Sequence, residues 1–159
     1  FSYTFFYSEF TGFDRDAYVP SSWDSRHLVS FTGGYKLPNN WEVSSRFRFA
    51  GKTPFAPTDL EASALTYPEL SIDYSRLGEE QLGRFSQLDI RIDRRWNFPR
   101  LSFDVFFEIQ NVLAQNTPEP TEFVLLRDTG GQIVDPRQLV AAEREDGSII
   151  PIIGLVVDF

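Results

Sequence analysis

The chain has 159 residues and a formal net charge of −8 at pH 7, and 16% of its residues are aromatic. The acidic balance argues against a nucleic-acid partner, because neutralising phosphates requires an excess of Lys and Arg. The absence of Cys excludes disulfides and thiolate metal sites. A helical membrane protein would need about 20 consecutive apolar residues, and the sequence has no such run. A mixture of aromatic and polar residues is instead typical of a transmembrane β-barrel, in which alternate residues face lipid and lumen.

The first half of the chain contains three segments that predict β-strands. Residues 2–10 are aromatic on both faces and fit the two-residue period of a strand less well than the other two segments. Residues 27–37 and 41–51 place mainly apolar side chains at odd positions and polar ones at even positions. The turn-forming residues 38–40 predict a tight hairpin between these two strands.

The second half repeats the pattern. Residues 85–96 are apolar at most even positions, interrupted by Arg94, and charged at most odd positions. Residues 101–109 are apolar at odd positions, and residues 97–100 predict a second tight turn between the two strands. Residues 148–159 predict the last strand, whose odd positions are again mainly apolar.

The connections alternate in length, and three of them are long: residues 11–25, 52–83 and 114–147. Long loops count against a compact soluble domain, whereas outer-membrane barrels combine short periplasmic turns with longer extracellular loops. This alternation predicts six antiparallel membrane strands and places the end of the last one on the periplasmic side. Within the third loop, residues 123–126 and 132–134 flank the turn-forming residues 128–131 and predict an exposed hairpin.

Strand parity assigns two groups of side chains. Tyr35, Trp41 and Trp96 fall on the lipid-facing phase close to the short turns, where an aromatic girdle is expected. The opposite phase carries charged residues that we expect to face the lumen and to form structural ion pairs across neighbouring strands: Arg46, Arg48, Asp89, Arg91, Asp93, Arg95, Asp104 and Glu108.

We expect no catalytic, cofactor or metal site. His27 is the single His, whereas zinc sites use several nitrogen or sulfur ligands, so we expect His27 to make a structural hydrogen bond at the start of its strand. One His without a convincing nucleophile also does not support a Ser–His–Asp triad. The sequence therefore does not predict an enzyme.

Several motifs resemble the C-terminal part of TonB-dependent outer-membrane receptors of the Bacteroidota type. They are Trp-Asp-Ser-Arg-His at residues 23–27, Gly-Lys-Thr-Pro-Phe-Ala-Pro at 51–57, Arg-Phe-Ser-Gln-Leu-Asp-Ile-Arg-Ile-Asp at 84–93, and Phe-Glu-Ile-Gln-Asn-Val-Leu at 107–113. The final residues, with Gly154, Val157 and Phe159 in a spaced pattern, resemble the signal read by the barrel-assembly machinery. The motifs follow the family's order across nearly the whole chain.

The resemblance implies that residues 1–159 are the C-terminal part of a plugged barrel of about 22 strands, in the bacterial outer membrane. The plug, the earlier strands and the region that contacts TonB are then outside this chain, on the same polypeptide or on another. The absence of Met also suggests a piece of a longer polypeptide. The implied function is energised uptake of a scarce ligand, without covalent chemistry or a cofactor. The implied partners are the remaining strands, the plug, TonB, lipid, lipopolysaccharide and the barrel-assembly machinery. The lumen-facing charges would contact the plug.

Two alternatives come from other classes. One is a small autonomous outer-membrane barrel with a structural or adhesive role, in which residues 70–74 and 122–126 supply a seventh and an eighth strand. The other is a soluble β-sandwich that acts as a binding module. Such a sandwich would have to hide its apolar face in a core, and the alternation of short and long loops would then be a coincidence.

Overall fold

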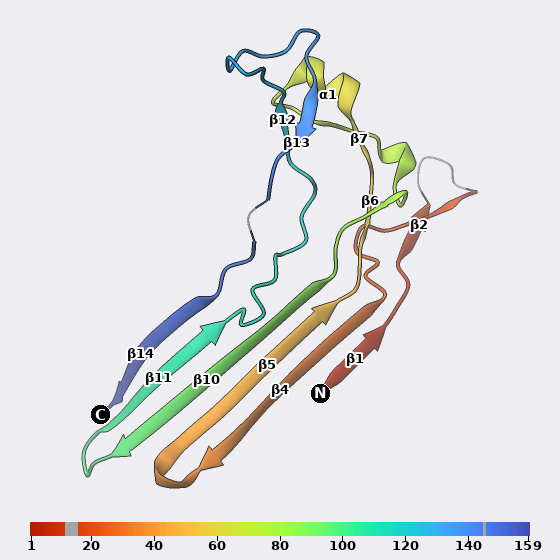
Figure 1. The fold of residues 1–159 in the computed structure, drawn as a ribbon. Coiled ribbons are helices and arrows are strands. Elements are labelled where there is room, and N and C mark those ends of the chain that lie inside the picture. Colours follow the sequence, from red (N-terminus) through yellow and green to blue (C-terminus); the bar gives the residue numbers. More distant parts are fainter. Residues whose placement is uncertain (12–15, 145) are drawn as a thin grey trace.

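The computed structural model describes residues 1–11, 16–144 and 146–159. Residues 12–15 and 145 belong to two of the expected long loops and lie outside the described residues. The main element is one antiparallel sheet with the strand order β1-β4-β5-β10-β11-β14 (Figure 1). Its strands are β1 (Ser2–Phe5), β4 (His27–Leu37), β5 (Trp41–Ala50), β10 (Phe85–Asn97), β11 (Ser102–Gln110) and β14 (Ile150–Asp158). The prediction of an antiparallel all-β chain is confirmed.

Each of the six predicted strand segments contains one strand of this sheet. The first segment is divided, because β1 ends at Phe5 and β2 (Glu9–Thr11) pairs within a loop with β3 (Tyr18–Pro20). In the described part of the chain the sheet stays open, with β1 and β14 as its two edges.

Both short turns lie at the same end of the sheet (Figure 1). The 3-10 turn η1 (Pro38–Asn40) joins β4 to β5, and Asn39 and Asn40 have φ values of 63° and 59°. Asparagine tolerates this left-handed region better than most residues. The turn between β10 and β11 is closed by a hydrogen bond of 2.9 Å from the Phe98 amide to the Leu101 carbonyl. These turns help to set the strand register, and the register decides which side chains share a face.

The three long connections extend from the opposite end of the sheet (Figure 1). They contain the two-stranded pairs β2–β3, β6 (Pro54–Phe55) with β9 (Glu80–Gln81), β7 (Thr58–Asp59) with β8 (Ser71–Ile72), and β12 (Phe123–Leu125) with β13 (Leu139–Ala141). They also contain the helix α1 (Leu60–Thr66) and the 3-10 turn η2 (Tyr74–Arg76). Among the described residues, no helix has both the length and the apolar character needed to cross a bilayer.

The buried apolar side chains of the described residues all lie in these connections: Ala56, Ala64 and Leu139. The helix α1 contacts β7, β8 and also β13 of the later loop. Its N-terminus is capped by the Asp59 side chain, which accepts a hydrogen bond of 3.0 Å from the Ala62 amide. Two loops that are distant in sequence therefore pack into one small body.

The predicted hairpin in the third loop forms only in part. Asp128 Oδ1 accepts hydrogen bonds from the amides of Gly130 and Gln132, which closes the predicted turn, and Arg127 forms an isolated bridge with Ile133. However, β12 pairs with β13 and not with residues 132–134. The tripeptide of β13 is too short to give a periodic signal in the sequence.

The structure also bears on the alternative arrangements. Within residues 70–74, β8 pairs only with β7, and within residues 122–126, β12 pairs only with β13, so neither segment adds a strand to the six-stranded sheet. In the described part of the chain, no second sheet packs on the first one, as a β-sandwich would require.

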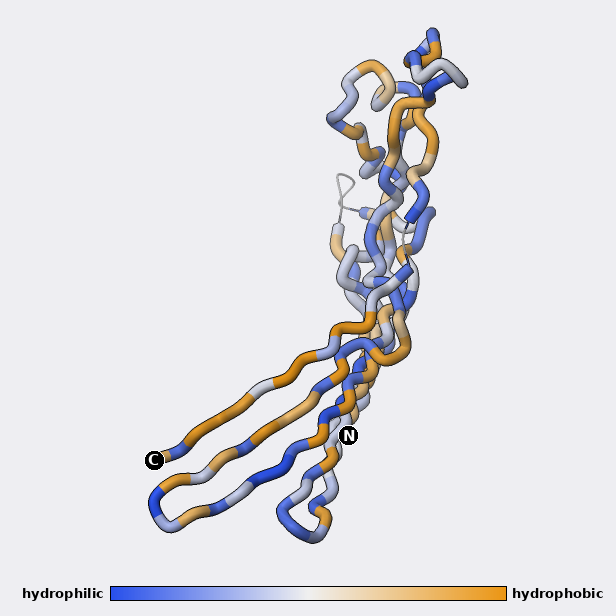
Figure 2. The backbone as a smooth tube through the Cα atoms, turned by 60° about the vertical axis from the view of Figure 1, so that its left-hand side comes forward, coloured by the Kyte–Doolittle hydropathy of each residue, from blue (hydrophilic) through white to orange (hydrophobic). Residues whose placement is uncertain are grey.

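Residues directly opposite each other in an antiparallel pair point to the same face of the sheet. The register thus sorts the strands into an apolar face and a charged face. One row of the apolar face runs across five strands through Tyr35, Val43, Ile92, Phe107 and Ile153. Figure 2 shows the alternation of hydrophobic and hydrophilic residues along the strands. The apolar side chains of this face are not buried by any described element.

Candidate functional site

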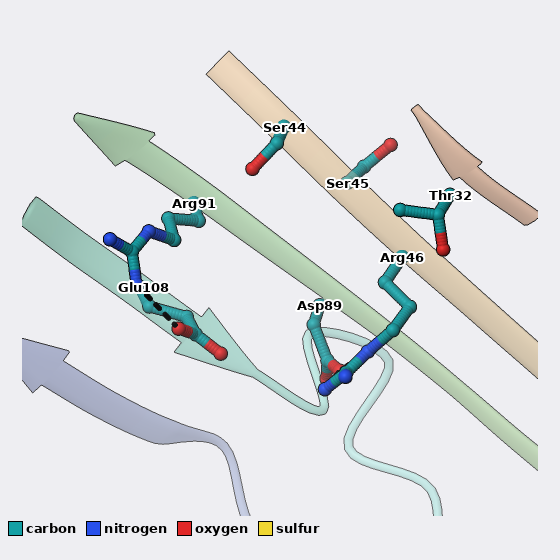
Figure 3. Close-up of a pocket in the computed structure, with 7 residues that line it drawn as sticks. All are labelled: Thr32, Ser44, Ser45, Arg46, Asp89, Arg91 and Glu108. Atoms are coloured by element: carbon teal, nitrogen blue, oxygen red, sulfur yellow. Dashed lines mark hydrogen bonds and ion pairs between the residues drawn. The ribbon is translucent and has the colours of Figure 1, made fainter. Parts of the chain in front are cut away.

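The candidate site is the charged face of the sheet, which carries all eight charged residues predicted from strand parity. Arg46 lies opposite Asp89, Arg91 opposite Glu108, and Arg95 opposite Asp104, so side chains from β5, β10 and β11 share this face. A shallow cavity of about 210 Å³ lies at its centre (Figure 3). Its lining residues are Thr32, Ser44, Ser45, Arg46, Asp89, Arg91 and Glu108.

Asp89 is the most buried charge on this face, with 4% of its surface exposed. Its Oδ2 accepts two hydrogen bonds from Arg46, of 2.9 Å from Nη2 and 3.2 Å from Nε. Its Oδ1 accepts 2.8 Å from Gln87 Nε2 and 3.0 Å from the Asn111 amide. A buried carboxylate is tolerated only when it is paired and hydrogen-bonded in this way. Arg48 lies farther off, with its Nη2 4.0 Å from Oδ2, and donates a hydrogen bond of 2.9 Å to the side-chain oxygen Oε1 of Gln87.

Arg91 contacts three different groups. Its Nε donates to Asp93 Oδ1 at 2.9 Å, and its Nη1 lies 3.7 Å from Glu108 Oε2 on β11 (Figure 3). Its guanidinium also stacks over the Phe106 ring, 3.7 Å from the ring centroid. Phe106 lies opposite Gly154, where a Cβ atom would stand 2.2 Å from the ring. The glycine makes room for the aromatic ring on which the arginine rests.

Arg95 forms a third group close to the short turns. Its Nη2 donates to Ser102 Oγ at 2.8 Å and to Asp158 Oδ2 at 3.0 Å, and its Nε donates to Asn97 Oδ1 at 3.1 Å. About half of both the Arg95 and the Asp158 side chains is exposed. This pair links β10 to β14 across the intervening strand β11.

The predicted cross-strand pairing holds for some residues and not for others. Arg46–Asp89 and Arg91–Glu108 join neighbouring strands. Asp93 instead pairs with Arg91 along its own strand, because the residue opposite it on β11 is Phe106. The prediction was also wrong for Asp104: among the described residues it has no hydrogen bond, and its Oδ1 is buried without a partner. Arg95, which lies opposite Asp104, is turned toward Asp158.

Asn111 is a residue of this site that strand parity did not select. Besides the amide hydrogen bond to Asp89, its side-chain Nδ2 donates to the carbonyls of Gln115, at 2.9 Å, and Ser148, at 3.0 Å. Its φ of 55° falls in the left-handed region that asparagine tolerates. Asn111 thus ties the end of β11 to the start of the last strand. The Gln-Asn-Val motif was the signal in the sequence that could have identified it.

A second cluster lies where β4 and β5 meet the long loops. Asp24, only 1% exposed, accepts a hydrogen bond of 2.9 Å from Arg26 Nε, and the Arg26 guanidinium stacks over the Tyr7 ring. Gly51 lies against the Ser25 carbonyl, which would stand 2.1 Å from a Cβ atom at that position. His27 Nδ1 and the Tyr3 hydroxyl are 2.9 Å apart in a hydrogen bond, the structural role predicted for this residue.

The remaining predicted residues lie at the end of the sheet with the short turns. Tyr35 is 72% exposed, and Trp41 and Trp96 lie on the apolar face, each with its ring in contact with the Arg94 guanidinium. In the last strand Val157 lies opposite Phe103, also on the apolar face. Phe159 follows the end of β14 and is fully exposed.

No grouping of three or more His, Cys, Asp or Glu side chains suited to a metal ion occurs in residues 1–11, 16–144 and 146–159. The comparisons with known proteins give no relative: no family model, no curated protein and no solved structure matches the chain.

Proposed function

We propose that this chain is part of the wall of a TonB-dependent outer-membrane transporter, with the apolar face of the sheet in lipid and the charged face toward the lumen. The observation that carries this proposal is a single-layer sheet with two different faces. No described element covers its apolar face, and the polar side chains of its charged face form hydrogen bonds with one another. In water such an apolar face would favour association. In a bilayer it is the surface that lipid requires.

Strand lengths support the proposal. Strands β4 and β10 have 11 and 13 residues, and a tilted strand needs about 9–11 residues to cross a membrane. An unpaired backbone group in hydrocarbon costs several kcal/mol, so a membrane sheet has to close on itself. The free edges of β1 and β14 therefore pair with further strands in this proposal, as in plugged barrels of about 22 strands.

The positions of the family-like motifs also support it. The Trp-Asp-Ser-Arg-His segment contains the Asp24–Arg26 pair, and its Ser25 carbonyl meets the glycine that opens the Gly-x-x-Pro segment. The Leu-Asp strand and the Gln-Asn-Val segment are joined by the hydrogen bond from the Asn111 amide to Asp89. Motifs that are separate in the sequence thus contact each other in pairs where the strands meet the loops.

In this function the charged face contacts a plug that fills the lumen. The Asp89 cluster is satisfied within the sheet and stiffens the wall, whereas the half-exposed side chains of Arg48 and Arg95 are accessible to the plug. A ligand binds from outside to the loops and the plug, TonB moves the plug from the periplasmic side, and the ligand crosses without covalent chemistry. The strands are assembled by the barrel-assembly machinery, which reads the last strand. Lipopolysaccharide and phospholipid then surround the apolar face.

Cysteine labelling tests this proposal, because the chain has no Cys of its own. Single cysteines replace alternate positions of β11 in the full-length protein in outer membranes: Phe103, Val105 and Phe107 on the apolar face, Ser102, Asp104 and Glu108 on the charged face. We expect a membrane-soluble maleimide to label the first set, and a water-soluble maleimide to label only the second. Equal labelling of both sets by the water-soluble reagent would contradict the proposal.

A further inference from the structure

Arg94 is an arginine on the apolar face of the sheet. Its row across the strands consists of Leu37, Trp41, Arg94, Val105 and Leu155. The other four side chains of this row are apolar or aromatic. A guanidinium, which stays ionised at any physiological pH, therefore interrupts the surface that the proposed function assigns to lipid.

The guanidinium of Arg94 contacts two indole rings, one from the neighbouring strand β5 and one from its own strand. Its Cζ is 5.0 Å from the ring centroid of Trp41 and 4.7 Å from that of Trp96. Among the described residues Arg94 has no hydrogen bond and no ion pair, and its Nε is buried without an acceptor. Arg46, Arg91 and Arg95 on the charged face each have a carboxylate within 4.0 Å.

The two rings do not neutralise this cation. A cation–π contact stabilises a guanidinium through the ring quadrupole, but an indole ring offers no oxygen to the N–H groups. A charge beside hydrocarbon is costly unless an opposite charge reaches it. The arrangement around Arg94 thus lacks an anion with oxygen acceptors.

Further strands of a barrel are badly placed to supply that anion. Both strands next to β10 belong to this chain and place Trp41 and Val105 beside Arg94. With about 4.8 Å between strands, the first strand beyond β14 lies about 14 Å from Arg94 along the sheet. The charged face and any plug are on the opposite side. The anion therefore has to come from the medium that the apolar face meets.

We propose that Arg94, in contact with the rings of Trp41 and Trp96, binds the phosphate group of a glycerophospholipid at the membrane surface next to the short turns. This inference rests on the proposed function, since it requires the apolar face to lie in lipid. Arg94 precedes the end of β10 by three residues, about 10 Å along a strand. Tryptophan side chains gather at this headgroup level. The planar fork of arginine also suits two oxygens of one phosphate.

The test uses the full-length protein extracted from outer membranes in a non-ionic detergent. Phosphatidylglycerol is titrated in, and bound lipid is counted by native mass spectrometry. We expect R94Q to weaken the tightest binding step about tenfold, the loss of one charge-assisted contact, and R94K to weaken it less. R100Q is the matched control, because Arg100 is an exposed arginine in the turn of the same hairpin. Wild-type binding by R94Q, or equal losses in R94Q and R100Q, would overturn the inference.

Two further measurements test whether the site binds free phosphate rather than a phospholipid, and whether the tryptophan rings contribute to binding. Excess inorganic phosphate should leave phosphatidylglycerol bound; displacement would show a site for free phosphate and overturn the lipid assignment. W96L keeps the charge and removes one ring, and we expect it to bind phosphatidylglycerol more weakly than the wild type. This variant carries the test if R94Q does not fold, and wild-type binding by W96L would then overturn the inference. If cysteine labelling alternates in the wild type while R94Q binds lipid normally, only this inference fails. If labelling does not alternate, the proposed function itself fails.

Discussion

Asp89 and Asp104 lie on the same face of the sheet and show two different outcomes for a carboxylate. Asp89 accepts hydrogen bonds from Arg46, Gln87 and Asn111, so both of its oxygens are satisfied. Asp104 keeps an oxygen that is buried and has no partner among the described residues. A buried acceptor without a donor costs about 1–3 kcal/mol. The difference arises because Arg46 turns toward the Asp89 carboxylate opposite it, whereas Arg95, which the register places opposite Asp104, turns toward Asp158 instead.

The Asp89 cluster predicts a specific loss of stability. D89N removes the charge that Arg46 pairs with, and because Arg46 is about half exposed and can turn to water, we expect a loss of about 1–3 kcal/mol in the free energy of unfolding. D158N is the control, since the Arg95–Asp158 pair is exposed and should contribute less than about 1 kcal/mol. Chemical denaturation of the refolded full-length protein in detergent measures both. Equal losses would contradict the central role of Asp89.

The two faces also predict different losses of unfolding free energy when an arginine is introduced. I153R puts a charge on the apolar face, two residues farther from the short turns than the row of Arg94, and should cost about 2–4 kcal/mol in a lipid environment. V156R introduces the arginine on the charged face, directly opposite Asp104, and should cost less than about 1 kcal/mol, because the new guanidinium can reach that carboxylate. Unfolding in lipid vesicles measures the two variants side by side. A similar cost for both would show that lipid does not meet the apolar face.

At the scale of single elements, β14 differs from the other strands. It is apolar on both phases, with Ile152 and Val156 on the charged face, and Gly154 interrupts it where the Phe106 ring crosses from β11. In the sequence, Gly154 belongs to the motif that resembles the assembly signal. In the structure the glycine accommodates a neighbouring side chain, because any Cβ atom there would overlap the ring.

This packing predicts that G154A destabilises the sheet by about 1–3 kcal/mol through overpacking. The methyl group displaces Phe106 and, with it, the stacked Arg91 guanidinium. The double variant G154A/F106L should recover most of the loss, because the smaller side chain leaves room for the methyl group. A double-mutant cycle of unfolding free energies tests this coupling. Additive effects of the two changes would mean that the ring and the glycine do not compete for space.

At the scale of the whole molecule, the chain consists of an open sheet and a body of loops beyond one of its ends (Figure 1). The described loops bury Ala56, Ala64 and Leu139 in contacts between segments far apart in the sequence, whereas the sheet has no core of its own. Its stability therefore has to come from hydrogen bonding between strands and from whatever covers the apolar face and the two edges.

The open edges predict the size of the functional protein. Because β1 and β14 need partner strands in a membrane, we expect the polypeptide recovered from outer-membrane extracts to be several times larger than the 18.3 kDa of this chain. Intact-mass measurement on protein detected through a peptide of this sequence tests this expectation. A mass of 18.3 kDa would contradict the proposed function.

The sequence by itself determined the strands and their faces. A two-residue period is a local property that each segment displays on its own, and turn residues mark the two hairpins. Both ends of β4 were therefore predicted correctly from the sequence, and the ends of β5, β10 and β11 were predicted within one or two residues. It could not show which charges pair. Arg46 and Asp89 are 43 residues apart, and their contact depends on strand register and on rotamers chosen among several possible partners. For the same reason the sequence could not predict the contacts of Arg94 with two tryptophans from different strands. Nor could it predict the packing of α1 on β13, because these short segments show no periodic pattern. Only the tertiary structure decided these contacts.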